Sequence, residues 1–166
     1  MDLTIFSKVW SYMIIKNTRD TMSDVYLDAL RIRNEVFVKE QGVPYALEVG
    51  SPVEEAMAVH FVAYSDSCDD EGCEKALGTV RLLMSQNYES GLIQRMAVLK
   101  FARETGVASG LMDNLAIFAQ EHKIHKLTLH AQLSARGFYD KMGYLPKGEI
   151  FEEAGIQHIT MVKTLP

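Results

Sequence analysis

The stretch MAVLKFARETGVASGLM, residues 96–112, joins an apolar segment to an amphipathic helix through a turn of glycine and other small residues. Apolar side chains recur at helical spacing through residues 106–122, which predicts a helix with one face in the core. At the start of this helix no helical carbonyl satisfies the backbone N–H groups, and small side chains let a ligand approach them. The positive end of the helix dipole lies at the same turn, so the stretch predicts an anion site. The alternative is that Gly106 and Gly110 only allow the helix to pack closely on a sheet.

The glycine spacing separates this turn from two well-known phosphate loops. It matches neither Gly-x-x-x-x-Gly-Lys-Ser/Thr nor Gly-x-Gly-x-x-Gly, and the strand before it arrives from a meander instead of opening a βαβ unit. The sequence therefore disfavours a nucleoside triphosphatase and a Rossmann dehydrogenase.

Length and charge bound the remaining possibilities. A chain of 166 residues is about one ordinary domain, and no repeat or linker divides it. We expect a single domain over residues 13–166 with residues 1–12 as an extension, because Met13 is an alternative start. The formal net charge of −5 disfavours nucleic acid as a partner. Asp2 and Lys8 interrupt the apolar start, so we expect neither a signal peptide nor a membrane span, and a cytoplasmic protein.

Two cysteines bracket an acidic turn between predicted strands. The spacing of Cys68 and Cys73 would permit a hairpin disulfide or a weak metal site. A tetrahedral metal site needs a full set of ligands, and no histidine or further cysteine lies nearby in the sequence. We therefore expect two thiols at a hairpin tip and no metal.

Hydrophobic periodicity predicts a mixed sheet with helices on both faces. A first strand is expected at 12–16, followed by a helix at 22–38 that Thr21 and Asp24 cap and that ends near Gly42. Three strands with short connections come next, at 58–65, 75–84 and 91–99, and are expected to pair antiparallel. The rest of the pattern predicts a helix at 105–122, a strand at 126–131, a helix at 134–142 and two strands at 148–151 and 157–163. This order predicts an α/β fold with six or seven strands.

The opening stretch resembles the acyl-coenzyme A site of the GCN5-related N-acetyltransferase (GNAT) family. In that family a strand is followed by Arg/Gln-x-x-Gly-x-Gly/Ala and a helix, and Arg103, Gly106 and Ala108 match this motif. The segment FYDKMGY is similar to a late helix of the family, in which a tyrosine, here Tyr139, is followed four residues later by glycine and an aromatic residue.

Three further segments, RIRNEVFVKEQGVP, LHAQ and FEEAGIQHITM, are similar to the ElaA-like subgroup of the same family. The likeness extends from Met13 to Lys163. It implies the GNAT fold, an acetyltransferase activity and acetyl-coenzyme A as co-substrate.

The resemblance also implies which residues hold the cofactor. The pantetheine arm is expected to pair with the free edge of the strand that carries Met96, as an added strand would. The pyrophosphate is expected on the backbone of the following loop, with the charge of Arg103 adding to the attraction. The family commonly has asparagine seven residues before the tyrosine, and this chain has Gln132. The expected cofactor-binding residues are Met96, Ala97, Val98, Arg103, Glu104, Thr105, Gly106, Val107, Ala108 and Gln132.

Acetyl transfer to an amine needs a neutral nucleophile, a polarised thioester carbonyl and a proton for the thiolate. An amine with a pKa of about 10.4 is almost wholly protonated at neutral pH, so a general base or a desolvating pocket is required. The resemblance implies Tyr139 as the acid and the Val98 N–H as the group that polarises the carbonyl. Glu40, at the end of the first helix, and His130, beside the acyl site, are the candidate bases. His60 and His158 are expected to be structural hydrogen-bonding residues. Structural or substrate-orienting roles are expected for Arg33, Arg81 and Arg95.

The expected reaction is direct transfer from acetyl-coenzyme A to a primary amine in a ternary complex, because no plausible catalytic cysteine lies near the motif. The acceptor is a small-molecule amine or a protein amine. Two alternatives stay open: RNEVFV is also similar to acyl-homoserine-lactone synthases, and a non-catalytic module would bind acyl-coenzyme A as a sensor or interaction signal. Sheet edges of this architecture often pair, so a homodimer is a further expectation.

Overall fold

The computed structural model describes residues 13–65 and 74–166. The expected extension at 1–12 and the turn that holds Cys68 and Cys73 lie outside the described residues. The first described element is a strand that begins at Met13.

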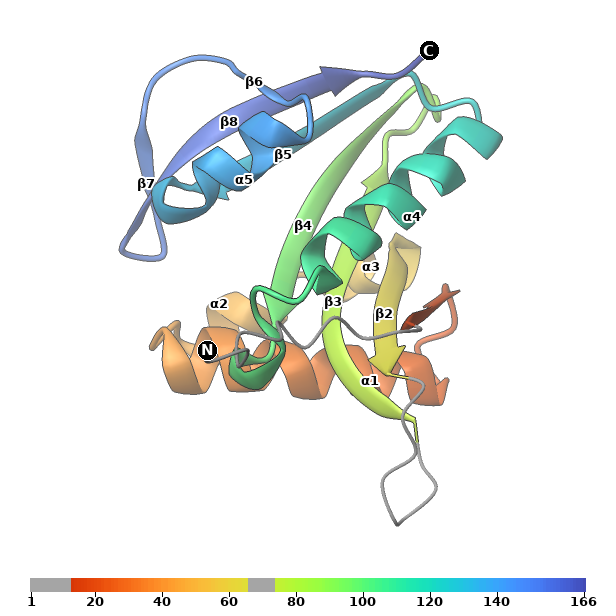
Figure 1. Ribbon diagram of the computed structural model, residues 1–166, viewed down its shortest axis with the longest axis vertical. Coiled ribbons are helices and arrows are strands. Elements are labelled where there is room, and N and C mark those ends of the chain that lie inside the picture. Colours follow the sequence, from red (N-terminus) through yellow and green to blue (C-terminus); the bar gives the residue numbers. More distant parts are fainter. Residues whose placement is uncertain (1–12, 66–73) are drawn as a thin grey trace, which may run out of the picture.

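One mixed sheet runs through the molecule (Figure 1). Its strands are β1 (Met13–Thr18), β2 (Val59–Ser65), β3 (Lys75–Met84), β4 (Ser90–Val98), β5 (Lys126–Gln132), β6 (Leu145–Pro146), β7 (Phe151–Glu153) and β8 (Ile156–Thr164). They follow the order β1-β2-β3-β4-β5-β8-β6, and β7 pairs with β8. All neighbours are antiparallel except β4 and β5, which are parallel. The described sheet has eight strands, not six or seven, because the short segment β6, which was not predicted, also pairs with β8.

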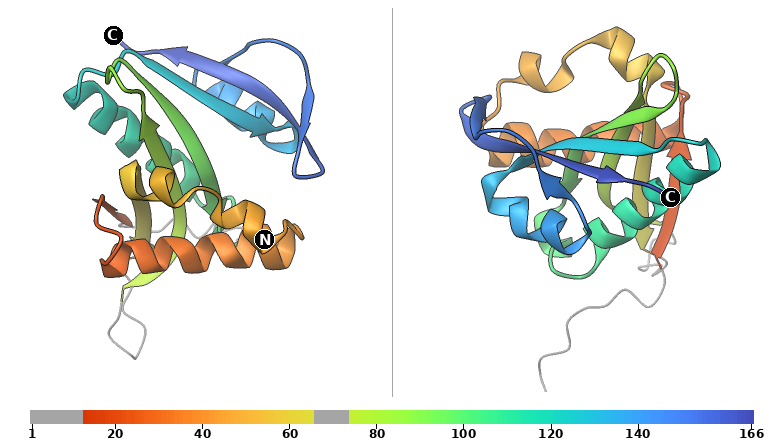
Figure 2. Two further views of the ribbon diagram at one scale, coloured as in Figure 1. Left: turned by 180° about the vertical axis from the view of Figure 1, so that it is seen from behind. Right: turned by 90° about the horizontal axis from the view of Figure 1, so that it is seen from above.

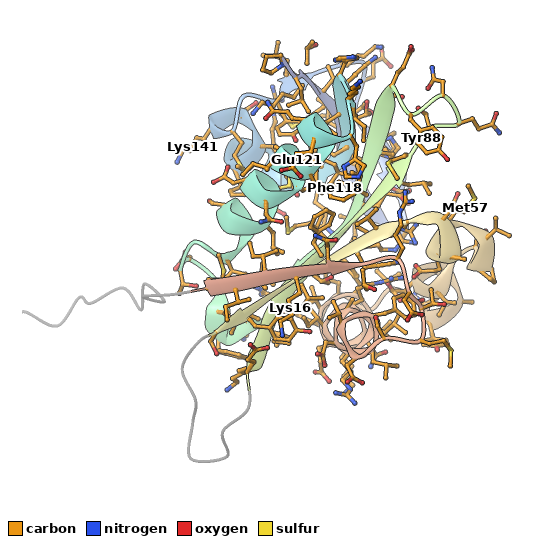
Figure 3. All side chains as sticks on the ribbon, turned by 90° about the vertical axis from the view of Figure 1, so that its right-hand side faces the viewer. Lys16, Met57, Tyr88, Phe118, Glu121 and Lys141 are labelled. Atoms are coloured by element: carbon orange, nitrogen blue, oxygen red, sulfur yellow. The ribbon has the colours of Figure 1, made fainter. Side chains whose placement is uncertain are left out.

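Helices cover both faces of this sheet. Their bounds are α1 (Asp24–Arg33), the π-helix η1 (Asn34–Glu40), α2 (Tyr45–Val49), α3 (Pro52–Met57), η2 (Lys100–Ala102), α4 (Val107–Glu121), η3 (Leu133–Ala135) and α5 (Arg136–Lys141). Seen from above, α4 and α5 lie on one side of the strands and α1, α2 and α3 on the other (Figure 2). Figure 3 shows the same division, with Phe118 of α4 and Met57 of α3 on different sides. The predicted α/β fold is confirmed.

Alternation along β2 divides the apolar side chains between two cores. Phe61 packs in the core under α4, whereas Val62 and Tyr64 pack in the core under α1. Successive side chains of a strand point to opposite faces, and every residue of β2 is buried. The central strands are therefore packed against helices on both faces. The ends of β4 and β5 are the part of the sheet where a site can open.

The first helix differs from its prediction at both ends. Ser23, not Thr21, caps α1, because its hydroxyl accepts the N–H of Tyr26 at 3.2 Å. The helix then continues in the wider π form to Glu40 before it stops ahead of Gly42, which has a φ of +73°. Single π-helical turns are frequent at functional sites.

Several short elements differ from what hydrophobic periodicity predicted. The helices α2 and α3 have five and six residues, too few to show a period, and were not predicted. The predicted helix at 134–142 divides into η3 and α5. The strand expected at 148–151 begins only at Phe151, because Gly148 has a φ of +83° in the preceding loop.

The strands β4 and β5 separate halfway along their length, as Figure 1 shows. They pair only over Ser90–Ile93 and Lys126–Leu129; beyond this segment β4 stays with β3 and β5 stays with β8. At the separation β4 carries a bulge, in which Arg95 and Met96 lie opposite a single residue of β3, and Arg95 has a φ of +59°. A bulge bends and twists its strand, and here it leaves one edge of β4 free.

Candidate active site

The free edge of β4 presents backbone groups to the space between β4 and β5. Toward β3, the N–H of Leu99 donates to the carbonyl of Leu77 at 2.9 Å. Backbone groups alternate in direction along an antiparallel pair, so those of Ala97 also face β3 and those of Val98 face the free edge. The Val98 carbonyl accepts Nε of Arg103 at 3.0 Å. The Val98 N–H is thus the group placed to meet an extended ligand, whereas Ala97 is buried.

The turn before α4 leaves backbone N–H groups uncovered. Gly106 is the N-cap with a φ of +88°, and no side chain caps the helix. The first helical hydrogen bond from this turn runs from Gly110 N–H to Gly106 O at 3.0 Å, so the amides of Val107 and Ala108 precede it. A Cβ on Gly106 would meet no atom within 4 Å. The turn has the open geometry that an anion requires.

The two glycines of this stretch differ in what they allow. A Cβ on Gly110 would lie only 2.1 Å from Cε of Met13 and 3.6 Å from Cδ1 of Ile15. Gly110 therefore lets α4 pack closely on β1. Gly106, by contrast, provides a left-handed backbone and open space, so the packing interpretation applies only to Gly110.

Arg103 and Glu40 form a bidentate ion pair beside this turn. Nη1 of Arg103 donates to Oε2 of Glu40 at 2.8 Å, and Nη2 donates to Oε1. The hydrogen bonds from Arg103 lower the pKa of Glu40, and the same bonds raise the pKa of Arg103. Glu40 also does not line the cavity described next. The structure thus places Glu40 against Arg103 and outside the lining of the cavity.

A cavity of about 350 Å³ opens where β4 and β5 part. Its wall combines the bulge of β4, the end of β5, α5, the segment after η1 and the turn between β7 and β8. Tyr139 of α5 lines it and is 6% exposed. Burial raises the pKa of Tyr139 to about 12, and no described residue hydrogen-bonds its hydroxyl. A protonated phenol is therefore free to donate into the cavity.

Gln132 is paired with a residue that sequence reasoning did not single out. Its Nε2 donates to Oε1 of Gln41 at 3.0 Å, and Nε2 of Gln41 donates back at 3.4 Å. Both side chains line the cavity. Because an amide pair has free donor and acceptor capacity, either glutamine can exchange its partner for an amide of a ligand.

Two histidines flank one carboxylate on the far wall of the cavity. Nδ1 of His130 and Nε2 of His158 each lie 3.9 Å from Oε2 of Glu153. Nδ1 of His158 lies 2.7 Å from the carbonyl of Ile156, which can only accept, so that nitrogen carries a proton. The ring of Phe151 contacts both imidazoles, at 5.2 and 5.8 Å between centroids. Glu153 was missed because an exposed glutamate in a short hairpin carries no sequence signal.

A buried ionic cluster lies on the β4 side of the cavity and consists of Arg33, Glu48, Glu55 and Arg81. Arg33 is 1% exposed and binds Glu48 at 2.5 Å and Glu55 at 2.8 Å, and Arg81 binds Glu55 as well. Burial opposes the ionised form of Glu55, but hydrogen bonds and charge from Arg33 outweigh it and lower the pKa of Glu55 to about 2. His60 is buried too, with Nε2 2.9 Å from the Glu55 carbonyl. These residues tie α1, α2, α3 and β3 together, and of them Glu48 also lines the cavity.

The expected residues thus fall into two neighbouring groups. Tyr139, His130, Gln132 and Met96 share the cavity, while 103–108 form the turn at the start of α4. Among the described residues no group of three or more histidine, cysteine, aspartate or glutamate side chains could hold a metal ion. Within the same residues, no helix is both long and apolar enough to cross a membrane.

Comparison with known proteins identifies the family of this chain. Residues 36–165 match a family model described as an acetyltransferase (GNAT) domain. The chain is 37% identical over 137 residues to YjcF of Bacillus subtilis, described as an uncharacterized N-acetyltransferase, with 82% of this chain and 90% of YjcF covered. It is 29% identical over 136 residues to the protein ElaA of Escherichia coli, with 81% and 84% covered.

Solved structures show the same fold. The crystal structure of Escherichia coli ElaA has a TM-score of 0.75 at 24% identity, covering 92% of this chain and 99% of that one. An aminoglycoside 6'-N-acetyltransferase complexed with coenzyme A has a TM-score of 0.66 at 16% identity, with 92% and 98% covered. Because the family model spans most of the chain and YjcF is similar over nearly its whole length, this protein belongs to the GCN5-related N-acetyltransferase family, in its ElaA-like subgroup.

Proposed function

We propose that this chain transfers an acetyl group from acetyl-coenzyme A directly to a primary amine in a ternary complex. One observation carries the proposal: the cavity between β4 and β5 brings the free edge of β4 together with a Tyr139 hydroxyl that no described residue binds. N-acetyl transfer is the reaction of the family, and the aminoglycoside enzyme compared above is complexed with coenzyme A.

The cofactor would lie along the edge of β4 and across the turn of α4. The pantetheine arm pairs with the backbone at Met96 and Val98, as an added strand does. The pyrophosphate accepts the amides at the start of α4, from Gly106 to Ala108, where the helix dipole favours negative charge. Arg103 adds its charge when it exchanges Glu40 for phosphate. Gln132 releases Gln41 to bind an amide of the arm.

The chemistry then follows from the groups in the cavity. The amine attacks the thioester carbonyl, whose oxygen is polarised by the Val98 N–H, and the carbon–sulfur bond breaks as the amide forms. Tyr139, protonated at neutral pH because burial raises its pKa to about 12, hydrogen-bonds the departing sulfur and supplies its proton.

The amine must lose a proton, and His130 is the better placed of the two proposed bases. Its ring lines the cavity, and Glu153, 3.9 Å from Nδ1, holds it electrostatically. Glu40 is assigned to Arg103 instead, since their ion pair lowers the pKa of that carboxylate.

The alternative is a sensor that binds acyl-coenzyme A without chemistry. Tyr139→Phe separates the two, because it removes only the hydroxyl. We expect its turnover, followed by thiol release with acetyl-coenzyme A and an amine panel, to fall about 100-fold, while the Kd for coenzyme A stays within about twofold.

Tyr144→Phe is the matched control: Tyr144 is a buried neighbour, 6.0 Å from Tyr139 between ring centroids, but it does not line the cavity. Equal losses of turnover and cofactor affinity in Tyr139→Phe would show that the hydroxyl is structural. A wild-type protein that binds coenzyme A and releases no thiol with any amine would be the sensor.

A further inference from the structure

On the β4 side of the cavity one arginine is incompletely paired. Glu48 lines this side, but its carboxylate already accepts Nε of Arg33 at 2.5 Å. Arg95, which also lines the cavity, reaches the same carboxylate only at 3.6 Å. One carboxylate thus faces two guanidinium groups, and the one in the cavity wall is the less well paired.

The hydrogen bonds of Arg95 occupy only part of its guanidinium group. Nε donates to the carbonyl of Glu48 at 3.3 Å and Nη2 to the carbonyl of Leu47 at 3.4 Å. A guanidinium has five N–H groups, so three remain without an acceptor among the described residues. Burial and the neighbouring charges of Arg81 and Arg33 lower the pKa of Arg95, so Glu48 and Glu55, which act in the opposite direction, compensate its charge only in part.

The backbone holds Arg95 in this place at a cost. Arg95 sits in the β4 bulge with a φ of +59°, a conformation that residues other than glycine rarely adopt. Bulges re-aim a side chain relative to the strand, and strained positions of this kind cluster at ligand sites. The bulge thus places the partly unpaired guanidinium of Arg95 in the wall of the cavity.

We propose that Arg95 binds a carboxylate of the acceptor, so that the amine acetylated by this protein also carries a carboxylate, as an amino acid does. The inference rests on the proposed function. The planar fork of a guanidinium matches a carboxylate with two parallel hydrogen bonds. A polyamine would instead bring a second cation against Arg95.

The remaining lining fits a small acceptor of this class. Glu153 lies between His130 and His158 and has the only carboxylate of the described lining that no arginine pairs. This carboxylate can attract the ammonium group of the acceptor or support the histidine that deprotonates that group. Phe37 and Ile156 add apolar surface for a side chain. A volume of about 350 Å³ is at the small end of ligand pockets.

The test compares acceptors that differ only in the carboxylate. The wild-type protein is assayed for thiol release with acetyl-coenzyme A and each free amino acid, its carboxamide and its decarboxylated amine, with spermidine and an amino sugar as further acceptors. We expect kcat/KM for the best amino acid to exceed that of its carboxamide about 100-fold.

Variants then assign this preference to one side chain. In Arg95→Gln the KM for the amino acid should rise about 100-fold while its carboxamide is unaffected, and Arg95→Lys should keep part of the preference because it retains the charge without the fork. Arg31→Gln, an exposed arginine on α1, is the matched control. Melting temperature and the Kd for coenzyme A, measured for each variant, separate a lost subsite from a lost fold.

The outcomes separate the two proposals. A carboxylate preference that disappears in Arg95→Gln, with cofactor affinity intact, supports the inference. Equal use of amino acids and carboxamides, or a preference that survives in a folded Arg95→Gln, overturns it and leaves the N-acetyltransferase function standing. Acetylation of no amine at all by a protein that binds coenzyme A overturns the proposed function, and the inference with it.

Discussion

Two arginine–glutamate pairs in this protein have the same chemistry and opposite surroundings. Arg33 and Glu48, in the buried ionic cluster, have side chains that are 1% and 4% exposed. Arg103 and Glu40, beside the α4 turn, have side chains that are 39% and 35% exposed. Burial, and not the type of residue, separates a pair that supports the fold from one whose arginine can turn to the proposed ligand.

The physical reason is the alternative available to each partner. If Glu48 left Arg33, the buried guanidinium would keep only Glu55, which Arg81 also binds, and two buried cations would then share one carboxylate, which is unfavourable. If Glu40 leaves Arg103, water or a phosphate takes its place at little cost. The first pair is therefore permanent, and the second is exchangeable.

Removing a carboxylate from the buried cluster should have the largest effect. Glu55→Gln leaves Arg33 and Arg81 short of negative charge, and we expect the free energy of unfolding to fall by about 3–5 kcal/mol. Urea denaturation at pH 7 measures this. Glu54→Gln is the control, because Glu54 binds Arg81 at 3.3 Å from a half-exposed position and should cost less than about 1 kcal/mol. Similar small losses in both variants would contradict a structural role for the cluster.

Acid should weaken the same cluster. The folded-state pKa of Glu55 is about 2, below its ordinary value of 4.5, so the unfolded chain takes up the proton at higher pH. The stabilisation, about 3 kcal/mol, is present above pH 4.5 and is lost as the pH falls toward 2. Urea denaturation between pH 6 and pH 3 should show a steeper loss for the wild type than for Glu55→Gln. Parallel pH profiles would rule out Glu55 as the source.

At the exchangeable region the largest effect should come from the turn itself. Gly106→Glu places bulk and negative charge where the phosphate is proposed to bind, and we expect the affinity for coenzyme A to fall more than about 100-fold. Gly148→Glu is the control, because Gly148 shares a positive φ and open space but lies in the loop before β7. Calorimetric titration with coenzyme A compares them. Unchanged affinity in Gly106→Glu would remove the turn from the cofactor site.

Glu40→Gln should have the smallest effect and the opposite sign. Freed from its carboxylate, Arg103 is available to phosphate, and we expect coenzyme A to bind about two- to fivefold more tightly, less so at high salt. Glu35→Gln, in the same helix and paired with Lys39 on the surface, should change nothing. A turnover that drops about 100-fold with unchanged affinity would restore Glu40 as the general base.

Prediction from the sequence succeeded where hydrophobic periodicity extended over many residues. It failed where an element was too short to show a period or where two residues had the same chemistry. The continuous apolar run around Phe61 and the helical spacing through Leu111 identified β2 and α4, because both periods extend over many residues. The cap was misplaced because Thr21 and Ser23 carry the same hydroxyl chemistry, and only the hydrogen bond to Tyr26 distinguishes them. The helices α2 and α3 have no more than two turns and therefore no readable period.

By itself the sequence determined the family, the α/β fold and the place of the turn before α4, where we propose that an anion binds. All of that turn lies within a few consecutive residues, so its backbone conformation follows from glycine and helix-start chemistry alone. The tertiary structure decided which charges are buried and which side chains meet. Glu40 reaches Arg103 across 63 positions, and Arg95, Tyr139 and Glu153 enter one cavity from separate elements. Ionisation and pairing depend on burial and on distant partners, which long-range packing sets and no local pattern records.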